Sequence, residues 1–273
     1  MILRDVKKNK FKTTIIIGFF AIFVTLFIYF ISLLLFDDVY IALIIGVIFS
    51  VVSSFTTYYN SDKIVLSLNK ARVANKSEDL EINNLLEGLC LATGLPKPKL
   101  YVMDDVSLNA FATGRNPNNA VICVTTGLLE KLDKYELEGV LAHELSHIKN
   151  YDILLSTIAS VMVGFVIMIS DLFSRTMIYR DSDDDSKSSG FVKFIGILFV
   201  LLAPLFGNLL QLDLSRNREY LADSTAVEIT RNKDGLINAL RKLTNDDNSL
   251  KTASKATASM FIVSPFSKIK KKT

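Results

Sequence analysis

The chain has 273 residues, a formal net charge of +3 and only two histidines. Half of its residues are hydrophobic and the mean hydropathy is +0.34. Because the apolar residues are bunched rather than periodic, this composition argues against a purely soluble protein. The small net charge and the lack of a basic, aromatic patch exclude nucleic acid as a partner.

Four long apolar segments account for the hydropathy. They cover residues 13–36, 39–59, 153–173 and 191–212. The first two contain no charged residue, and the other two contain one each, Asp171 and Lys193. Each segment has about the 20 residues that a helix needs to cross a bilayer. We therefore predict a multi-span helical membrane protein.

The charges beside these segments predict its orientation. Residues 1–12 carry five basic residues, whereas the turn between the first two segments is Asp37-Asp38. Cytoplasmic loops carry the excess of Lys and Arg, so the N-terminus is predicted to be cytoplasmic. Two crossings then return the chain to the cytoplasm, which also places the polar stretch 60–152 there. In that compartment the two cysteines, Cys90 and Cys123, are expected to be free thiols.

The polar stretch is predicted to be mainly α with a small β-sheet. Apolar spacing predicts helices over 61–74 and 79–93, a strand over 99–105, a hairpin of 109–114 with 120–129, and a helix that begins at Asp133. Gly94 stops the second of these helices, and Glu136 forms a capping box with Asp133.

Both histidines of the chain lie in the predicted helix that follows, in the sequence HELSH at 143–147. Positions i and i+4 share one helix face, so His143 and His147 can direct two imidazoles at one point. Two His and one Glu are a frequent ligand set of catalytic zinc, which leaves a position for water. Glu144 can take a proton from that water as general base, which is the H-E-x-x-H arrangement of zinc peptidases.

A third ligand is expected from a second helix, in SRNREYLADSTAVE at 215–228. Glu219 can complete a His2Glu set, and Asp223, one turn later, can accept a hydrogen bond from a ligand histidine. The alternatives Glu136, Glu138 and Glu228 stay open as ligands, although the first two lie on the same helix as the histidines and reach the site poorly.

HELSH together with SRNREYLAD resembles the membrane-embedded M48 metallopeptidases. NAFATG at 109–114 and the following NNAVICVTTGLL are similar to the HtpX group of that family. The resemblance covers most of the chain and implies a gluzincin-type metallopeptidase domain with one Zn²⁺ per chain, bound by His143, His147 and Glu219. It also implies an endopeptidase of the plasma membrane that removes misfolded membrane proteins. The family pattern continues beyond MFIVSPFS at 260–267, where this chain has only a few basic residues.

Further roles are expected around the zinc. Asn109 and Ala110 lie on a predicted edge strand that can pair with an extended substrate. Arg216, with Arg218 as second choice, can stabilise the oxyanion. Because His147 lies six residues before the third apolar segment, we expect the HExxH helix to continue into it and hold the zinc near the inner membrane surface.

The predicted organisation has four parts. They are an N-terminal membrane anchor at 1–59, a cytoplasmic protease core at 60–152, two membrane segments with an acidic loop at 153–212, and a third-ligand helix with the C-terminal part of the protease domain at 213–273. The expected partners are protein substrates, chiefly membrane proteins, and the lipid bilayer.

Two other functions are compatible with the sequence. One is a site-2-type intramembrane metalloprotease, in which Asp213 would be the third ligand. The other is a non-catalytic four-span scaffold with an inert pair of histidines, although the apolar segments offer few of the polar residues that cargo handling requires.

Overall fold

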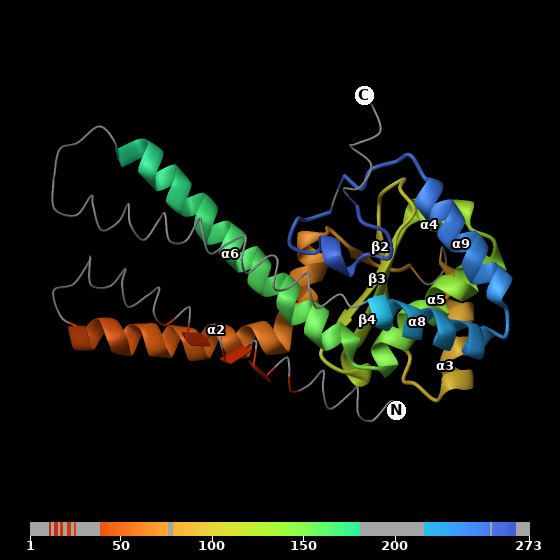
Figure 1. The fold of residues 1–273 in the computed structure, drawn as a ribbon, viewed down its shortest axis with the longest axis horizontal. Helices are drawn as coiled ribbons and strands as arrows, with labels where there is room; N and C mark the ends of the chain where they lie inside the picture. Colours follow the sequence, from red (N-terminus) through yellow and green to blue (C-terminus); the bar gives the residue numbers. More distant parts are fainter. Residues whose placement is uncertain are drawn as a thin grey trace.

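Two long helices project from a body that contains a small sheet and the remaining helices (Figure 1). The structure is a computed structural model. It describes residues 39–75, 79–180, 216–251 and 253–265, with a few positions between 11 and 25. As predicted, this part of the chain is mainly helical and has one small mixed sheet.

The projecting helices are α2 (Val39–Leu68) and α6 (Asp152–Arg180), which pack against each other. α2 contains the whole second apolar segment and continues beyond it without a break. The prediction of a helix over 61–74 holds for residues 61–68, which form the end of α2, and is wrong beyond Leu68, where the chain turns into a short strand at Arg72–Val73. The helix ends just before Lys70, which has a left-handed φ of 52°.

Two of the four predicted membrane segments lie in described helices, 39–59 in α2 and 153–173 in α6. The segment 191–212 lies outside the described residues, as does most of 13–36. Within the described part of the chain, no helix is both long enough and apolar enough to cross a membrane.

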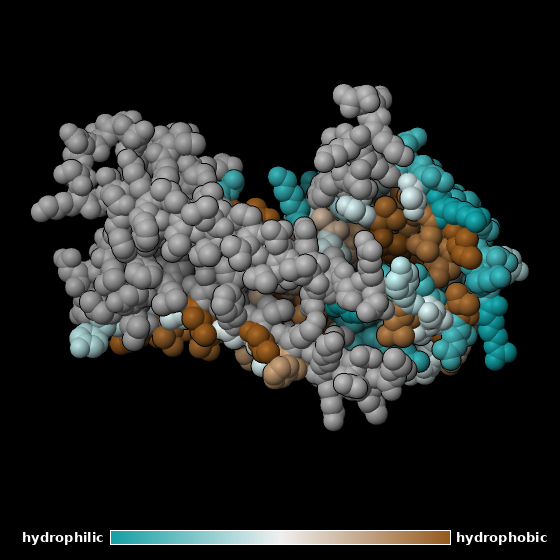
Figure 2. Space-filling model, viewed as in Figure 1, coloured by the Kyte–Doolittle hydropathy of each residue, from teal (hydrophilic) through white to brown (hydrophobic). Residues whose placement is uncertain are grey.

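Apolar side chains cover much of the surface of α2, which runs along the lower left of Figure 2. Ile44, Ile48, Val51 and Phe55 follow one another at helical spacing, and each is between 57% and 63% exposed. Such a continuous apolar surface is uncommon on a protein that meets only water.

The sheet has four strands in the order β1-β2-β4-β3. They are β1 (Arg72–Val73), β2 (Lys99–Met103), β3 (Ala110–Gly114) and β4 (Ala120–Thr125). β2 and β4 are parallel, and the other two pairs are antiparallel. The predicted hairpin is confirmed, with Gly114 opposite Ala120 across a short 3-10 turn, η1 (Pro117–Asn119). Its second strand ends four residues earlier than predicted, because the Thr125 side chain caps the next helix by accepting from Leu128 N.

Five further helices surround this sheet. They are α3 (Leu80–Thr93), α4 (Thr126–Lys131), α5 (Lys134–Lys149), α8 (Arg216–Thr230) and α9 (Lys233–Asn245). α3 stops at Gly94, whose φ of 70° is left-handed, and α5 starts with the predicted capping box of Asp133 and Glu136. Both boundary predictions are confirmed.

The helix α5 lies at the centre of the body, in contact with β3, α3, α8 and α9 (Figure 1). Its apolar residues Val140, Leu141, Leu145 and Ile148 are completely buried. The backbone of α9 approaches α5 closely at Gly139, where a Cβ atom would lie 2.8 Å from the nitrogen of Leu236. The HExxH sequence is therefore on a fixed helix rather than on a surface element.

The chain turns sharply between α5 and α6. α5 ends at Lys149, Tyr151 has a left-handed φ of 60°, and α6 begins at Asp152. The expectation that the HExxH helix continues directly into the third apolar segment is therefore wrong. The reversal brings the first residue of α6 back toward the last turn of α5.

After α9 the chain returns along the open edge of β3. The backbone N–H of Ile262 donates to the carbonyl of Ala110 at 3.2 Å, and the Asn109 side chain donates to the carbonyl of Val263 at 2.7 Å. The Phe261 ring packs edge-on against Phe111 with 5.0 Å between centroids. This C-terminal segment, residues 257–263, includes a short 3-10 turn, η2 (Ala258–Met260).

Candidate metal centre and active site

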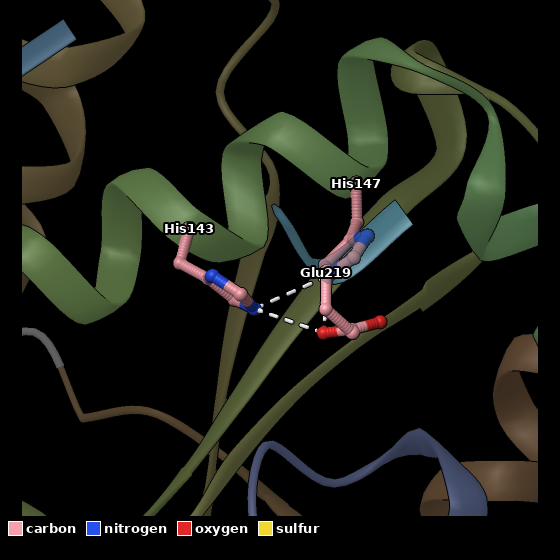
Figure 3. Close-up of side chains that lie close together, drawn as sticks. All are labelled: His143, His147 and Glu219. Atoms are coloured by element: carbon pink, nitrogen blue, oxygen red, sulfur yellow. Dashed lines mark hydrogen bonds and ion pairs between the residues drawn. The ribbon is translucent and has the colours of Figure 1, made fainter. Parts of the chain in front are cut away.

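The two histidines of α5 point into the same space, as the helical spacing predicts (Figure 3). Their Nε2 atoms lie 3.2 Å apart, and the ring planes are nearly perpendicular at 81°. His143 is buried and His147 is mostly so, with side chains 4% and 16% exposed. Both rings are thus surrounded mainly by protein atoms and have little contact with solvent.

Glu219 reaches these two rings from α8, which packs against α5. Its Oε2 atom lies 3.6 Å from His143 Nε2 and 3.7 Å from His147 Nε2 (Figure 3). In tetrahedral geometry, metal bonds of about 2.0–2.1 Å place the ligand atoms about 3.3 Å from one another. Among the described residues, His143, His147 and Glu219 form the one group of three that could hold a metal ion, and their spacing fits zinc.

The other nitrogen of each imidazole is bonded to a carboxylate. His143 Nδ1 lies 2.9 Å from Asp223 Oδ1, and His147 Nδ1 lies 3.1 Å from Asp152 Oδ2. These bonds place the proton of a neutral imidazole on Nδ1 and leave the Nε2 lone pair for a metal. The sequence predicts such a partner at Asp223. It does not predict Asp152, because only the turn at Tyr151 brings the start of α6 to His147.

Four carboxylates surround the two imidazoles, those of Glu144, Asp152, Glu219 and Asp223, and they shift the pKa values strongly. Burial lowers the pKa of His147, but the carboxylates of Asp152 and Glu219 outweigh burial and raise it to about 10. Burial tends to raise the pKa of Glu219, but the two imidazoles lower it well below its usual range. The cluster therefore has a strong preference for positive charge, which protons or a metal cation can supply.

Glu144 is 2% exposed and lines a cavity of about 220 Å³ together with the two histidines and Glu219. Burial raises its pKa, while the two imidazoles and the backbone N–H of Ala112 act in the opposite direction and offset part of that rise. A carboxylate whose pKa is raised accepts a proton more readily, as a general base must.

The cavity is lined by both polar and apolar residues. The polar lining consists of the metal-site residues with Asp152, Ser156, Arg218 and Ser259, and the apolar lining consists of Ala112, Ile153, Met260, Phe261 and Ile262. Sequence reasoning missed the contribution of 259–262, because a short coil segment far from HELSH carries no motif that indicates its position.

Three of the predicted accessory residues are not placed at the cavity by the structure. Asn109 and Ala110 are hydrogen-bonded to the C-terminal segment, so the edge predicted for substrate is occupied there by the chain itself. Arg216 begins α8, but its side chain lies outside the described part of the structure. Arg218, the second choice for the oxyanion, lines the cavity.

The alternative ligands do not join the cluster either. Glu136 completes the cap of α5 and forms an ion pair with Lys242 at 2.6 Å. Glu138 and Glu228 lie within the described part of the chain, and neither belongs to the group of residues that could bind a metal ion together. Asp213, the ligand of the site-2 alternative, lies outside the described residues.

Comparison with known proteins agrees with this site. The model of peptidase family M48 matches residues 76–267, which include HELSH, Glu219 and the C-terminal segment. The chain belongs to peptidase family M48. The resemblance inferred from HELSH and SRNREYLAD is therefore confirmed, and the non-catalytic scaffold is not favoured.

Several M48 relatives align with nearly the whole chain. A "Protease HtpX homolog" of Lactobacillus helveticus is 41% identical over 97% of this chain and 92% of the relative. Homologues with the same name in Dictyoglomus turgidum and Listeria monocytogenes serotype 4a are 40% and 38% identical. They cover 96% and 100% of this chain and 86% and 93% of their own lengths. The assignment to the HtpX group is thus confirmed.

The structure is also similar to the crystal structure of S. mikatae Ste24p, with a TM-score of 0.48 and 24% identity. That match covers 93% of this chain, but this chain spans only 62% of the Ste24p chain. Membership of M48 makes the protein a metallopeptidase, which implies a metal and protein or peptide substrates. The cluster of His143, His147 and Glu219 is compatible with that metal.

Proposed function

We propose that the protein is a zinc-dependent endopeptidase with His143, His147 and Glu219 as zinc ligands and Glu144 as general base. The observation that carries the proposal is the convergence of three ligand atoms from α5 and α8 beside a buried carboxylate in one cavity. One zinc per chain would offset part of the negative charge of the four carboxylates. With three ligands among the described residues, a fourth position of a tetrahedral zinc would be left for water.

Each residue of the site has a role in peptide hydrolysis. Bound zinc would supply a Lewis acid for the scissile carbonyl and acidify a water molecule. Glu144 accepts the proton of the attacking water and transfers it to the leaving amine as the peptide bond breaks. Asp223 and Asp152 hold the two imidazoles in the tautomer that ligation needs. Arg218 lines the same cavity, where its guanidinium can stabilise the developing oxyanion.

Glu144→Gln separates catalysis from metal binding. Gln has nearly the same shape but cannot accept the proton, so we expect casein hydrolysis to fall by about 10²- to 10⁴-fold, the range of general-base catalysis. Zinc per chain, measured by elemental analysis of the purified protein, should stay at that of the wild type. Glu219→Ala is the matched variant and should lose both zinc and activity.

The proposal would be wrong if the intact protein, supplied with zinc, remained metal-free, or if Glu144→Gln hydrolysed casein at the wild-type rate. It would also fail if Glu219→Ala retained its zinc.

We further propose that the chain is a multi-pass protein of the plasma membrane whose N-terminus and catalytic domain are cytoplasmic and whose substrates include misfolded membrane proteins. The uncharged sequence of 39–59 and the outward-facing apolar side chains of α2 support lipid contact. The basic residues of 1–12 support the orientation. In this arrangement 1–59 and 153–212 are membrane parts, and 60–152 and 213–273 form the protease domain.

Cysteine labelling tests that orientation. Both native cysteines are buried, Cys90 at 5% and Cys123 at 0% exposed, whereas Leu91 is 81% exposed on α3. Leu91→Cys in intact cells should react with a membrane-impermeant maleimide only after permeabilisation. Equal labelling before permeabilisation would place the catalytic domain outside.

A further inference from the structure

The C-terminal segment is fixed on the body at three points. The buried Thr257 hydroxyl donates to the side chain of Asn69 at 2.9 Å, where both residues are fully buried. Phe261 is 7% exposed and packs on Phe111. Asn109 then binds the backbone of Val263. These contacts come from Asn69 just after α2, from Phe111 of β3 and from Asn109 just before β3. The segment therefore forms a fixed wall of the body.

This wall determines how much of the β3 edge a substrate can reach. Backbone groups of an antiparallel edge strand point alternately to the neighbouring strand and outward. The carbonyl of Asn109 accepts a hydrogen bond from Thr125 of β4, whereas the carbonyl of Ala110 points outward and accepts one from Ile262. The next outward residue is Ala112, which lines the cavity beside Glu144. Ala112 is therefore the outward-facing residue of β3 that lies at the cavity, since the Gly114 N–H is bonded to Thr157 of α6 at 3.2 Å.

The side chains of the wall alternate in burial. Phe261 turns into the core, while Met260 and Ile262 on either side of it are only partly buried and line the cavity. Ile153 at the start of α6 and Ala112 of β3 line the same cavity, so its apolar lining comes from three elements beside the metal-site residues.

We propose that Met260 and Ile262 of the C-terminal segment, with Ile153, form the specificity pocket of this peptidase and select a medium-sized or large apolar side chain next to the scissile bond. The inference rests on the proposed endopeptidase function and adds its substrate class. A peptide at the metal site would contact these apolar side chains as well as the polar cluster. Binding an apolar side chain there removes its surface from water, which is favourable. A charged side chain would lose its hydration without gaining a partner, which is unfavourable.

The test compares Met260→Lys, Met260→Ala and the wild type on matched fluorogenic peptides. Cleavage of casein by the wild type, analysed by mass spectrometry, identifies the residue flanking the cleaved bond, and the peptides carry Leu, Ala or Glu at that position. Leu91→Lys is the control, because it makes the same kind of change on the exposed surface of α3. Zinc content and melting temperature show that each variant is folded.

We expect the ratio of kcat/KM for the Leu peptide to that for the Glu peptide to fall by about 10-fold or more in Met260→Lys. In Met260→Ala the preference for Leu over Ala should fall, because the wall has lost contact area. Leu91→Lys should leave both ratios unchanged. If Met260→Lys does not fold, the Met260→Ala comparison decides.

Ratios that stay within twofold of the wild type in the folded Met260 variants would overturn the inference, as would a wild-type cleavage pattern without apolar residues beside the cut. In both cases cleavage would still depend on zinc and Glu144, so the proposed function would stand. A wild-type protein that binds zinc but cleaves no peptide would overturn the proposed function and the specificity pocket together.

Discussion

Asp152 offers the sharpest test of how the metal centre is held. Its Oδ2 atom lies 3.1 Å from Nδ1 of His147, and its residue is 6% exposed. Removing the carboxylate partner of a ligand histidine weakens metal binding by about 10- to 100-fold. Asp152→Ala should therefore raise the Kd for zinc by that factor, which corresponds to about 1.4–2.7 kcal/mol. Asp152→Asn should have a smaller effect, since the amide oxygen can still accept from Nδ1–H.

The assay is a competition for zinc between the purified protein and a chromophoric chelator of known affinity. Asp223→Ala removes the equivalent bond at His143 and should weaken binding to a similar extent. Asp104→Ala, which changes an exposed aspartate 69% accessible to solvent, is the control. If Asp152→Ala bound zinc within threefold of the wild type while Asp223→Ala did not, the bond at His147 would make no contribution to metal binding.

Four further substitutions test packing, capping and charge in the helical body. Gly139→Ala should lower the melting temperature, because its Cβ would lie 2.8 Å from Leu236 N, whereas Gly88→Ala, with nothing within 4 Å, should stabilise α3 by about 0.5–1 kcal/mol in denaturant unfolding. Glu136→Ala removes the cap of α5 and the ion pair with α9 and should cost about 1–3 kcal/mol; an unchanged unfolding midpoint would contradict this. Burial tends to raise the pKa of Asp246, but hydrogen bonds from the backbone of Leu108 and its other neighbours lower it. A carboxylate whose pKa is lower in the folded than in the unfolded state stabilises the fold at pH values above its unfolded-state pKa. This stabilisation is lost as the pH falls through the folded-state pKa. Asp246→Asn should therefore lose less stability than the wild type when the pH is lowered below about 4.

Local patterns predicted the parts of the site that depend on local geometry. The four-residue spacing of His143 and His147 needs only a helix to bring the rings together, and the capping box of Asp133 and Glu136 predicted where that helix begins. The same reasoning paired Glu219 with Asp223 on one helix face, and the structure places both against the imidazoles. No local pattern specifies which helices are neighbours. The packing of α8 on α5 was expected only because a metal site needs a third ligand.

The residues that sequence reasoning missed all depend on tertiary contacts. Asp152 reaches His147 only because Tyr151 adopts a left-handed conformation, which is uncommon for a bulky residue and has no signal in the sequence. Similarly, the motif NAFATG correctly indicated an edge strand near the metal. It did not show that the C-terminal segment binds Asn109 and Ala110.

The metal centre joins three helices, of which α5 and α6 are consecutive and α8 lies far along the chain. α5 contributes both imidazoles, α8 contributes Glu219 and the partner of His143, and α6 contributes the partner of His147. In the absence of a cation the four carboxylates of the cluster repel one another, so a bound metal would stabilise the packing of α8 and α6 on α5 as well as catalyse hydrolysis. Since α6 also belongs to the pair of projecting helices, the position of the Asp152 carboxylate depends on how that pair is seated. Metal affinity and the seating of α6 are therefore coupled through a single hydrogen bond.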